Sequence, residues 1–253
     1  MRAWKVTRLD GHSLHGDVLY VAGHTYIARA LRDGEAYTPC SDTVLHASPT
    51  PLDALGYSTV GLHVALWEVE GNPVVSDETK SGYASLSVLR RVPVEEEDVL
   101  YGFRVSEARQ PINPALITPV TTGTRALLTE WVSVRETVRA SMASICASLG
   151  VSVGSLVWDS VMASVGESVG ESVRDSIGES VCASVSKSIR ASVWASVWAY
   201  IGSLFTGVWR GEYPFASGEE LWRRGLIPVC VSGEWRLYHP VVGGPAVRVE
   251  AGV

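Results

Sequence analysis

The stretch ASVGESVGESVRDSIGESVCASVSKSIRASVWASVWAYIGSLF, from Ala163 to Phe205, decides the fold because it repeats every four residues. From Ser160 to Ser196 a serine occupies every fourth position, and a Val or Ile follows each one. The slot before the serine holds mainly Ala, Asp or Glu, and the slot after the Val or Ile varies. The repeat as a whole extends over residues 143–202. A four-residue period therefore has to be matched to a backbone conformation.

An α-helix fits this period poorly. Four residues advance about 400° around a helix with about 3.6 residues per turn, so a stripe of valines drifts by about 40° per repeat. Glycines inside the repeat each cost about 1 kcal/mol relative to Ala in a helix. An extended chain, in contrast, turns every fourth side chain to the same face. The sequence therefore predicts a tetrapeptide-repeat β-solenoid over residues 127–205, with Val and Ile in its interior, and a helical bundle is the alternative.

Two uncharged stretches of the repeat raise a third interpretation. Residues 140–158 and 191–209 each contain nineteen residues without a charge, which is long enough to span a bilayer. A serine at every fourth position is also a spacing of small residues that lets membrane helices approach closely. The same tetrapeptide continues, however, through a charged block between these stretches. We therefore expect one continuous structure, and membrane insertion is disfavoured.

The residues before the repeat predict a separate domain. Residues 1–107 contain alternating apolar stretches, at 61–71 and 84–95, that are typical of strands. Pro51 and the spacing of the apolar residues after it predict a short helix between the strands. The sequence thus predicts a small, β-rich α+β domain over residues 1–107.

Two further segments complete the predicted organisation. Residues 108–126 are rich in Pro and Thr, which predicts an extended linker. Residues 206–253 contain a short-helix signature and then a strand–turn–strand pattern, which predicts a small α/β cap on the repeat. Because the N-terminal domain and the solenoid are both predicted to be β-rich, the predicted fold class of the whole chain is mainly β.

The composition limits the classes of partner and compartment. The chain of 253 residues has a formal net charge of −6, which argues against a nucleic-acid binder that neutralises phosphates. Its four cysteines are widely spaced and fit neither a zinc site nor a disulfide scaffold. Few Asn and Gln residues are typical of proteins from thermophiles. Because no signal-peptide pattern is visible either, we expect a cytoplasmic or virion-associated protein without cofactor or metal.

Residues 12–95 contain a recognisable order of motifs. VAGHTY (Val21 to Tyr26), VLHASPTPLDALGY (Val44 to Tyr57), VALWEVEG and LSVLRRV follow one another. In this order they resemble an uncharacterised N-terminal domain of phage and bacterial repeat proteins, in which a Cys stands where this chain has Ser48. The Ser-Val tetrapeptides and the residues after them resemble uncharacterised prokaryotic repeat proteins. These resemblances imply a repetitive, solenoid-like tail and no known activity.

Three residues of the N-terminal domain raise an enzymatic alternative. His46, Tyr57 and either Glu68 or Glu70 are similar to the His–Tyr–Glu set of ADP-ribosyl-transfer enzymes. That similarity implies that His and Tyr hold a dinucleotide, while Glu stabilises a cationic transition state. Their spacing does not require such a site, so a structural role for these residues is favoured.

Three tryptophans carry the main functional prediction. Trp158, Trp194 and Trp198 occupy the variable slot after Val. On a solenoid they would point outward, and an exposed Trp marks an interface. We therefore predict a non-enzymatic structural or interaction scaffold that self-associates through the repeat as a homo-oligomer or binds a protein partner. An ADP-ribosyl-transfer-like enzyme and a membrane-inserting protein are the alternatives.

Overall fold

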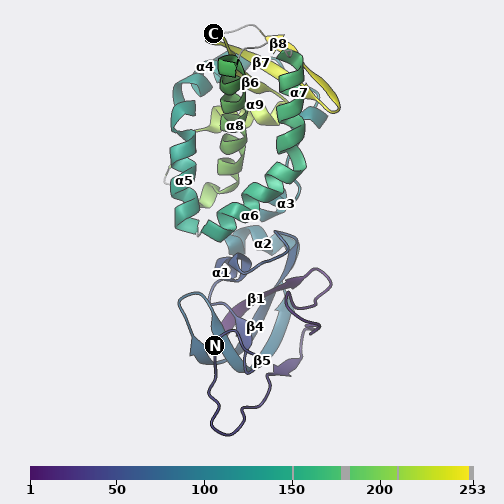
Figure 1. Cartoon of the computed structure of the whole chain (residues 1–253), viewed down its shortest axis with the longest axis vertical. Helices are drawn as coiled ribbons and strands as arrows, with labels where there is room; N and C mark the ends of the chain where they lie inside the picture. The colour runs from purple at the N-terminus through teal and green to yellow at the C-terminus, as the bar shows by residue number, and fades with distance from the viewer. Residues whose placement is uncertain (150, 178–182, 210, 251–253) are drawn as a thin grey trace. The chain divides into compact units, whose positions relative to one another are not determined.

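The structure, a computed structural model, describes residues 1–149, 151–177, 183–209 and 211–250. It divides into two compact units (Figure 1). Unit 1 contains Met1–Ser106 and Leu149–Leu156, and unit 2 contains Glu107–Ser148 and Val157–Val253. Each unit has its own antiparallel sheet, and the two are described separately.

Unit 1 is built on a five-stranded antiparallel sheet. Its main path has the order β1-β4-β5-β2, and β3 pairs with β5. The strands are β1 (Arg2–Arg8), β2 (Thr25–Ile27), β3 (Leu45–Ala47), β4 (Val64–Ser76) and β5 (Ser81–Arg91). A further bridge joins Trp4 of β1 to Ser48 after β3, so β3 lies between β5 and β1. The strands predicted at 61–71 and 84–95 are confirmed as β4 and β5.

The core of unit 1 lies against the long strands. Trp67, Val69 and Leu86 are buried there, and the Trp67 indole donates a hydrogen bond of 2.8 Å to the hydroxyl of Thr7. The predicted short helix is confirmed as α1 (Pro51–Gly56). Pro is favoured in the first turn of a helix, where its missing N–H leaves no bond unmade. Two more helices follow the sheet: α2 (Val94–Tyr101) and α3 (Val105–Arg109).

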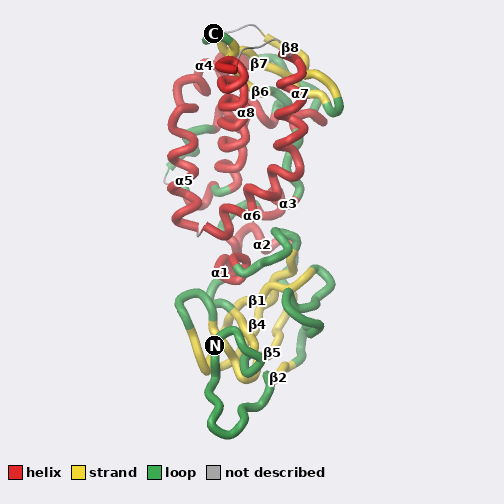
Figure 2. Tube along the Cα trace, viewed as in Figure 1, coloured by secondary structure: helices red, strands yellow, loops and turns green. Residues whose placement is uncertain are grey.

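The repeat is helical, so the predicted solenoid is wrong. In Figure 2 the described part of the repeat is drawn as helix, and strands occur only outside it. Helices take up 41% of the chain and strands 26%, so the fold class is α+β rather than mainly β. None of the helices in the described ranges is both long and apolar enough to cross a membrane. The helices are α4 (Thr124–Val134), α5 (Val138–Leu149), α6 (Val151–Val161), α7 (Glu167–Ile177) and α8 (Ala183–Leu204).

The drift of the valine stripe, which argued against a helix, is limited because the repeat is not one straight helix. A π-helical segment, η3 (Met162–Gly166), separates α6 from α7. A π-helical turn holds more residues than an α-helical turn, so it rotates less per residue and reverses part of the drift. Five successive valines of the column are each at most 1% exposed: Val157, Val161, Val165, Val169 and Val173. The prediction that the Val/Ile column forms the core is confirmed.

The serine column is compatible with helix because its hydroxyls find backbone partners. Ser164 donates to the carbonyl of Ser160 at 2.9 Å, and Ser192 donates to the carbonyl of Ser188 at 2.9 Å. This bond to the residue four positions earlier satisfies a serine inside a helix without water. Burial of the valines then outweighs the poor helix propensity of Ser, Val and Gly.

The rest of unit 2 is a three-stranded sheet and one helix. The sheet has the order β6-β7-β8, and α9 (Ala216–Arg223) precedes it. Its strands are β6 (Ile227–Val231), β7 (Glu234–Val241) and β8 (Gly244–Glu250). Ser232 and Gly233 both have positive φ, as a two-residue type I′ hairpin turn requires. Helices α5 and α7 run on either side of α8 (Figure 1), while α7 packs on β8 and α8 on β6.

The segment predicted as an extended linker, residues 108–126, belongs to unit 2 and makes specific contacts with the rest of that unit. The Trp222 indole donates a hydrogen bond of 2.8 Å to the carbonyl of Ile112, whose N–H donates one of 2.9 Å to the Tyr200 hydroxyl. The Arg224 guanidinium donates to the carbonyl of Thr122 at 2.6 Å. A 3₁₀ turn, η1 (Pro114–Leu116), lies between these contacts. The proline-rich segment is thus packed against α8 and α9 rather than extended away from them.

Two glycine substitutions test the helical packing of unit 2. Gly170→Ala adds a methyl group in α7 with no atom within 4 Å, so we expect a gain of up to about 1 kcal/mol in unfolding free energy. Gly218→Ala, in α9, places the methyl group 2.5 Å from the buried Trp131 ring, and we expect a loss of about 1–3 kcal/mol. Urea-induced unfolding followed by circular dichroism measures both. Destabilisation by Gly170→Ala would contradict the helical assignment of this segment.

Candidate ligand-binding site

The three predicted tryptophans come together in one stacked cluster within unit 2. Trp158 is on α6, and Trp194 and Trp198 lie one turn apart on α8. The centre of the Trp158 ring lies 5.3 Å from that of Trp194 and 4.1 Å from that of Trp198, with interplanar angles of 18° and 26°. All three side chains are half-buried. They therefore use part of their surface to pack on one another, and self-association through them stays a prediction.

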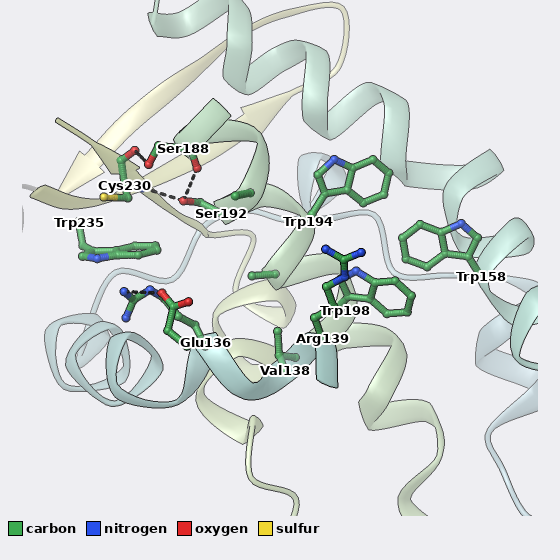
Figure 3. A pocket seen from close by; sticks show the side chains of 13 residues that line it. Glu136, Val138, Arg139, Trp158, Ser188, Ser192, Trp194, Trp198, Cys230 and Trp235 are labelled. Atoms are coloured by element: carbon green, nitrogen blue, oxygen red, sulfur yellow. Dashed lines mark hydrogen bonds and ion pairs between the residues drawn. The ribbon is translucent and has the colours of Figure 1, made fainter. Parts of the chain in front are cut away.

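A cavity of about 580 Å³ lies beside this cluster. Figure 3 shows the three tryptophans at one end and Trp235 of β7 at the other. Arg135 and Arg139, from the start of α5 and the turn before it, line the side between them. Four indoles and two guanidinium groups thus surround one space.

The repeat explains why α8 has a cavity on one face. Each residue of a helix is rotated by about 100° from the one before it. Ile189, Val193 and Val197 therefore share one face of α8, and all three are buried. The slot before serine lies about 200° from Val and turns to the opposite face, where the cavity lies, and the serine and Trp slots flank it.

Small side chains form the floor of the cavity on that opposite face. Ala191 and Ala195, from the slot before serine, lie between the two tryptophans on one side and Ser188 and Ser192 on the other. An alanine fills little space, so the flanking indoles stand above the floor. The order Ala-Ser-Val-Trp thus gives α8 a core face and a concave face at once.

The two arginines differ in their partners. The Arg135 guanidinium lies 4.5 Å from the centre of the Trp235 ring and forms an ion pair of 2.9 Å with Glu136. Arg135 also donates a hydrogen bond to the carbonyl of Val132. Arg139 lines the same cavity as Trp198 (Figure 3), and no described residue forms an ion pair or a hydrogen bond with its guanidinium. Arg139 is therefore the cation of this wall with its hydrogen-bonding capacity unused by the described residues.

The serine wall of the cavity is fixed by the edge strand β6. Ser188 donates a hydrogen bond of 3.2 Å to the carbonyl of Cys230, and the Cys230 N–H donates one of 3.1 Å to the Ser192 hydroxyl. Dashed lines in Figure 3 mark bonds of this group. Because both hydroxyls serve the backbone, neither has a base that would activate it as a nucleophile. This wall therefore fixes the shape of the cavity and supplies no activated nucleophile.

The sequence did not predict the remaining members of the site. Arg135, Arg139 and Trp235 lie outside the part of the repeat with a strict four-residue period. The two arginines are four residues apart, which places them on one face of a helix, but many surface arginines have that spacing. Trp235 follows a hairpin turn some forty residues after Trp194. Only the packing of β7 against the helices could reveal it.

The structure brings two of the three residues of the enzymatic alternative near a common group. The Nζ of Lys80 lies 4.7 Å from the centre of the Tyr57 ring, and the charge of Lys80 acts on His46. The Glu68 carboxylate instead binds Arg2 and Arg90, at 2.8 and 2.9 Å. Neither arginine has an interaction with His46 or Tyr57 among those of the described residues. Among the described residues, the contacts of Glu68 are thus with these two arginines, and the enzymatic alternative stays a prediction.

The described ranges contain no cluster of three or more His, Cys, Asp or Glu residues that could hold a metal ion.

The pH dependence of stability tests the environment of His46. Burial, followed by the charges of Lys80 and Lys5, lowers its pKa from 6.5 to about 4. Between these values the unfolded chain binds a proton that the folded chain does not, so this group removes stability as the pH falls from about 6.5 to 4. We expect the unfolding free energy of the wild type to fall more steeply in this window than that of His46→Gln. His63→Gln, at an exposed histidine, is the matched control, and an unchanged slope in His46→Gln would contradict the assignment.

Comparisons with known proteins do not assign this chain to a family. No model of a protein family matches it, and neither a curated protein nor a solved structure does. The resemblance of residues 12–95 to a phage and bacterial domain therefore stays a prediction, and the function has to be argued from the site itself.

Proposed function

We propose that this is a non-enzymatic interaction protein whose unit 2 binds a planar, negatively charged organic molecule in the tryptophan cavity. The observation that carries the proposal is the position of Arg139. Its guanidinium has no partner among the described residues, and the residue lines the same cavity as the stacked indoles. A cation and flat aromatic surfaces in one cavity are complementary to an aromatic anion.

The size and lining of the cavity support a small ligand. Cavities that bind small molecules in proteins measure about 300–1,000 Å³ and are mostly apolar with a few polar groups. The cavity of about 580 Å³ lies within that range. Indole rings offer large rigid surfaces, and aromatic rings stack with offsets at centre distances of about 4.5–7 Å. Trp194, Trp198 and Trp235 present such surfaces around the Ala191 floor.

The charge of the wall supports an anion rather than a neutral ring. A guanidinium binds carboxylate, sulfonate or phosphate oxygens through two parallel N–H bonds. Arg135 is already engaged by Glu136 and the Trp235 ring, whereas Arg139 is available to a ligand. Hydrogen bonds to a charged group contribute about 1.5–3 kcal/mol, which is a factor of about 10–100 in affinity.

The residues around the cavity support binding without catalysis. Ser188 and Ser192 are used by the Cys230 backbone, and the Glu136 carboxylate is paired with Arg135. No general base is thus placed against a nucleophile in the lining. A role as an interaction protein, as the tryptophan pattern predicted, is the proposal that this lining supports.

Calorimetric titration of the full chain with naphthalene-2-sulfonate tests the proposal, with 2-naphthol as the uncharged analogue. We expect the sulfonate to bind more tightly than the naphthol, because only the sulfonate pairs with Arg139. Arg139→Gln should weaken sulfonate binding by about tenfold or more and leave naphthol binding nearly unchanged. Trp158→Leu should weaken both, because it removes the ring on which Trp194 and Trp198 stack.

A charge-matched control separates the cavity from the general field of the protein. Arg190→Gln removes the same charge from an exposed position of α8 outside the cavity lining. It should leave both affinities unchanged. Equal losses in Arg139→Gln and Arg190→Gln, or no binding of either probe, would overturn the proposal. Light scattering with and without the sulfonate also shows whether the predicted homo-oligomer exists and whether the ligand dissociates it.

A further inference from the structure

The loop that carries Cys40 in unit 1 has a defined and unusual geometry. Cys40 has a φ of +59°, in the left-handed region that residues other than glycine rarely adopt. Its N–H donates a hydrogen bond of 2.9 Å to Nε2 of His46 in β3. The thiol is free and the residue is exposed. The sulfur is therefore presented to solvent from a fixed backbone.

Lys80 brings an ammonium group to this sulfur from the turn between β4 and β5. Its Nζ lies 3.4 Å from the Cys40 Sγ and 4.7 Å from the centre of the Tyr57 ring. The turn is ordered, because the Lys80 N–H donates a hydrogen bond of 2.7 Å to a carboxylate oxygen of Asp77. The Tyr57 hydroxyl is hydrogen-bonded to that of Thr79 in the same turn, at 2.7 Å. Two segments forty residues apart thus hold a sulfur and an amine in contact.

The surroundings of the pair are positively charged. Lys5 donates a hydrogen bond of 2.9 Å to the carbonyl of His46. The ring of His46 is neutral at pH 7, because burial and the charges of Lys80 and Lys5 lower its pKa to about 4. Asp77 is the carboxylate whose charge opposes them at His46. Reactive cysteines occupy electropositive, partly exposed positions of this kind.

We propose that Cys40 and Lys80 form a peroxide-responsive pair that closes a reversible covalent S–N bond. In the first step the Cys40 thiolate attacks one oxygen of a hydroperoxide, so that an S–O bond forms and the O–O bond breaks. The sulfur is oxidised by two electrons and the peroxide is reduced. The Lys80 ammonium gives a proton to the leaving oxygen, which departs as water or an alcohol. The products are a sulfenic acid and a neutral amine.

In the second step the Lys80 amine attacks the sulfur of the sulfenic acid. An S–N bond forms, the S–O bond breaks, and the hydroxyl leaves as water with a proton from the amine. The condensation of a sulfenic acid with a nitrogen is established chemistry and needs no further oxidant. A thiol reductant attacks the same sulfur and restores both side chains. The bond ties the Cys40 loop to the β4–β5 turn and protects the sulfur from irreversible oxidation.

Mass spectrometry of the full chain treated with excess hydrogen peroxide tests the pair. The S–N product is ~2 Da lighter than the untreated chain and reverts with dithiothreitol, whereas a sulfenic acid is ~16 Da heavier. Peptide mapping should join the peptide of Cys40 to that of Lys80. An internal disulfide has the same mass as the S–N product, and the map distinguishes the two. A disulfide of Cys40, or a wild type that stops at the sulfenic acid, would overturn the proposal.

Variants at Lys80 separate its two roles. Lys80→Arg keeps the positive charge but should not close the bond, so Cys40 should accumulate as a sulfenic acid that reacts with dimedone. Lys80→Met removes the proton donor to the leaving oxygen, so peroxide should oxidise Cys40 at least tenfold more slowly. Cys230→Ser should leave the joined peptide unchanged, and circular dichroism verifies the fold of each variant. Loss of ~2 Da that persists in Lys80→Arg would exclude the amine as the partner.

Discussion

Hydrogen bonds from serine hydroxyls to the edge of the β6–β8 sheet orient the repeat, and the rest of unit 2 depends on them. The Ser172 hydroxyl donates a hydrogen bond of 2.8 Å to the carbonyl of Gly244 and accepts one of 2.8 Å from the N–H of Val241. Ser188 and Ser192 bind the carbonyl and the N–H of Cys230 in the same manner. Because Val follows Ser by about 100° of helix rotation, a serine fixed on the sheet turns its valine into the core.

This orientation shows why the four-residue period was assigned to the wrong backbone. The drift argument assumed one straight helix, whereas the chain has separate helices and a π-helical segment that reverses part of the drift. The buried valine column was predictable, since it follows from period alone. The choice between helix and strand was not, because it depends on tertiary packing and on serine hydroxyls that bond to the preceding turn. Unit 1 was more predictable, since the strand patterns at 61–71 and 84–95 are local in the sequence.

The tryptophan cavity of unit 2 and the Cys40–Lys80 pair of unit 1 were likewise only partly predictable from the sequence. Trp158, Trp194 and Trp198 were visible as a recurring slot, but Trp235 and the arginines reach the cavity only through folding. In unit 1, His46 and Tyr57 were singled out together with a glutamate, and in the structure Glu68 is bound by Arg2 and Arg90. Their neighbour Lys80 gives them a different context, and no spacing in the sequence connects it with Cys40.

The cavity follows from the composition of the repeat and not from its period. In α7 the slot before the serine holds Glu171, and the slot after the valine holds Arg174. Both residues are exposed. The same two slots in α8 hold Ala191 and Trp194. A charged side chain in the first slot would fill the space above the helix and bring water with it, whereas alanine leaves a hollow that the indole bounds. One tetrapeptide therefore builds a solvated helix face in α7 and a cavity in α8, with the serine and valine unchanged.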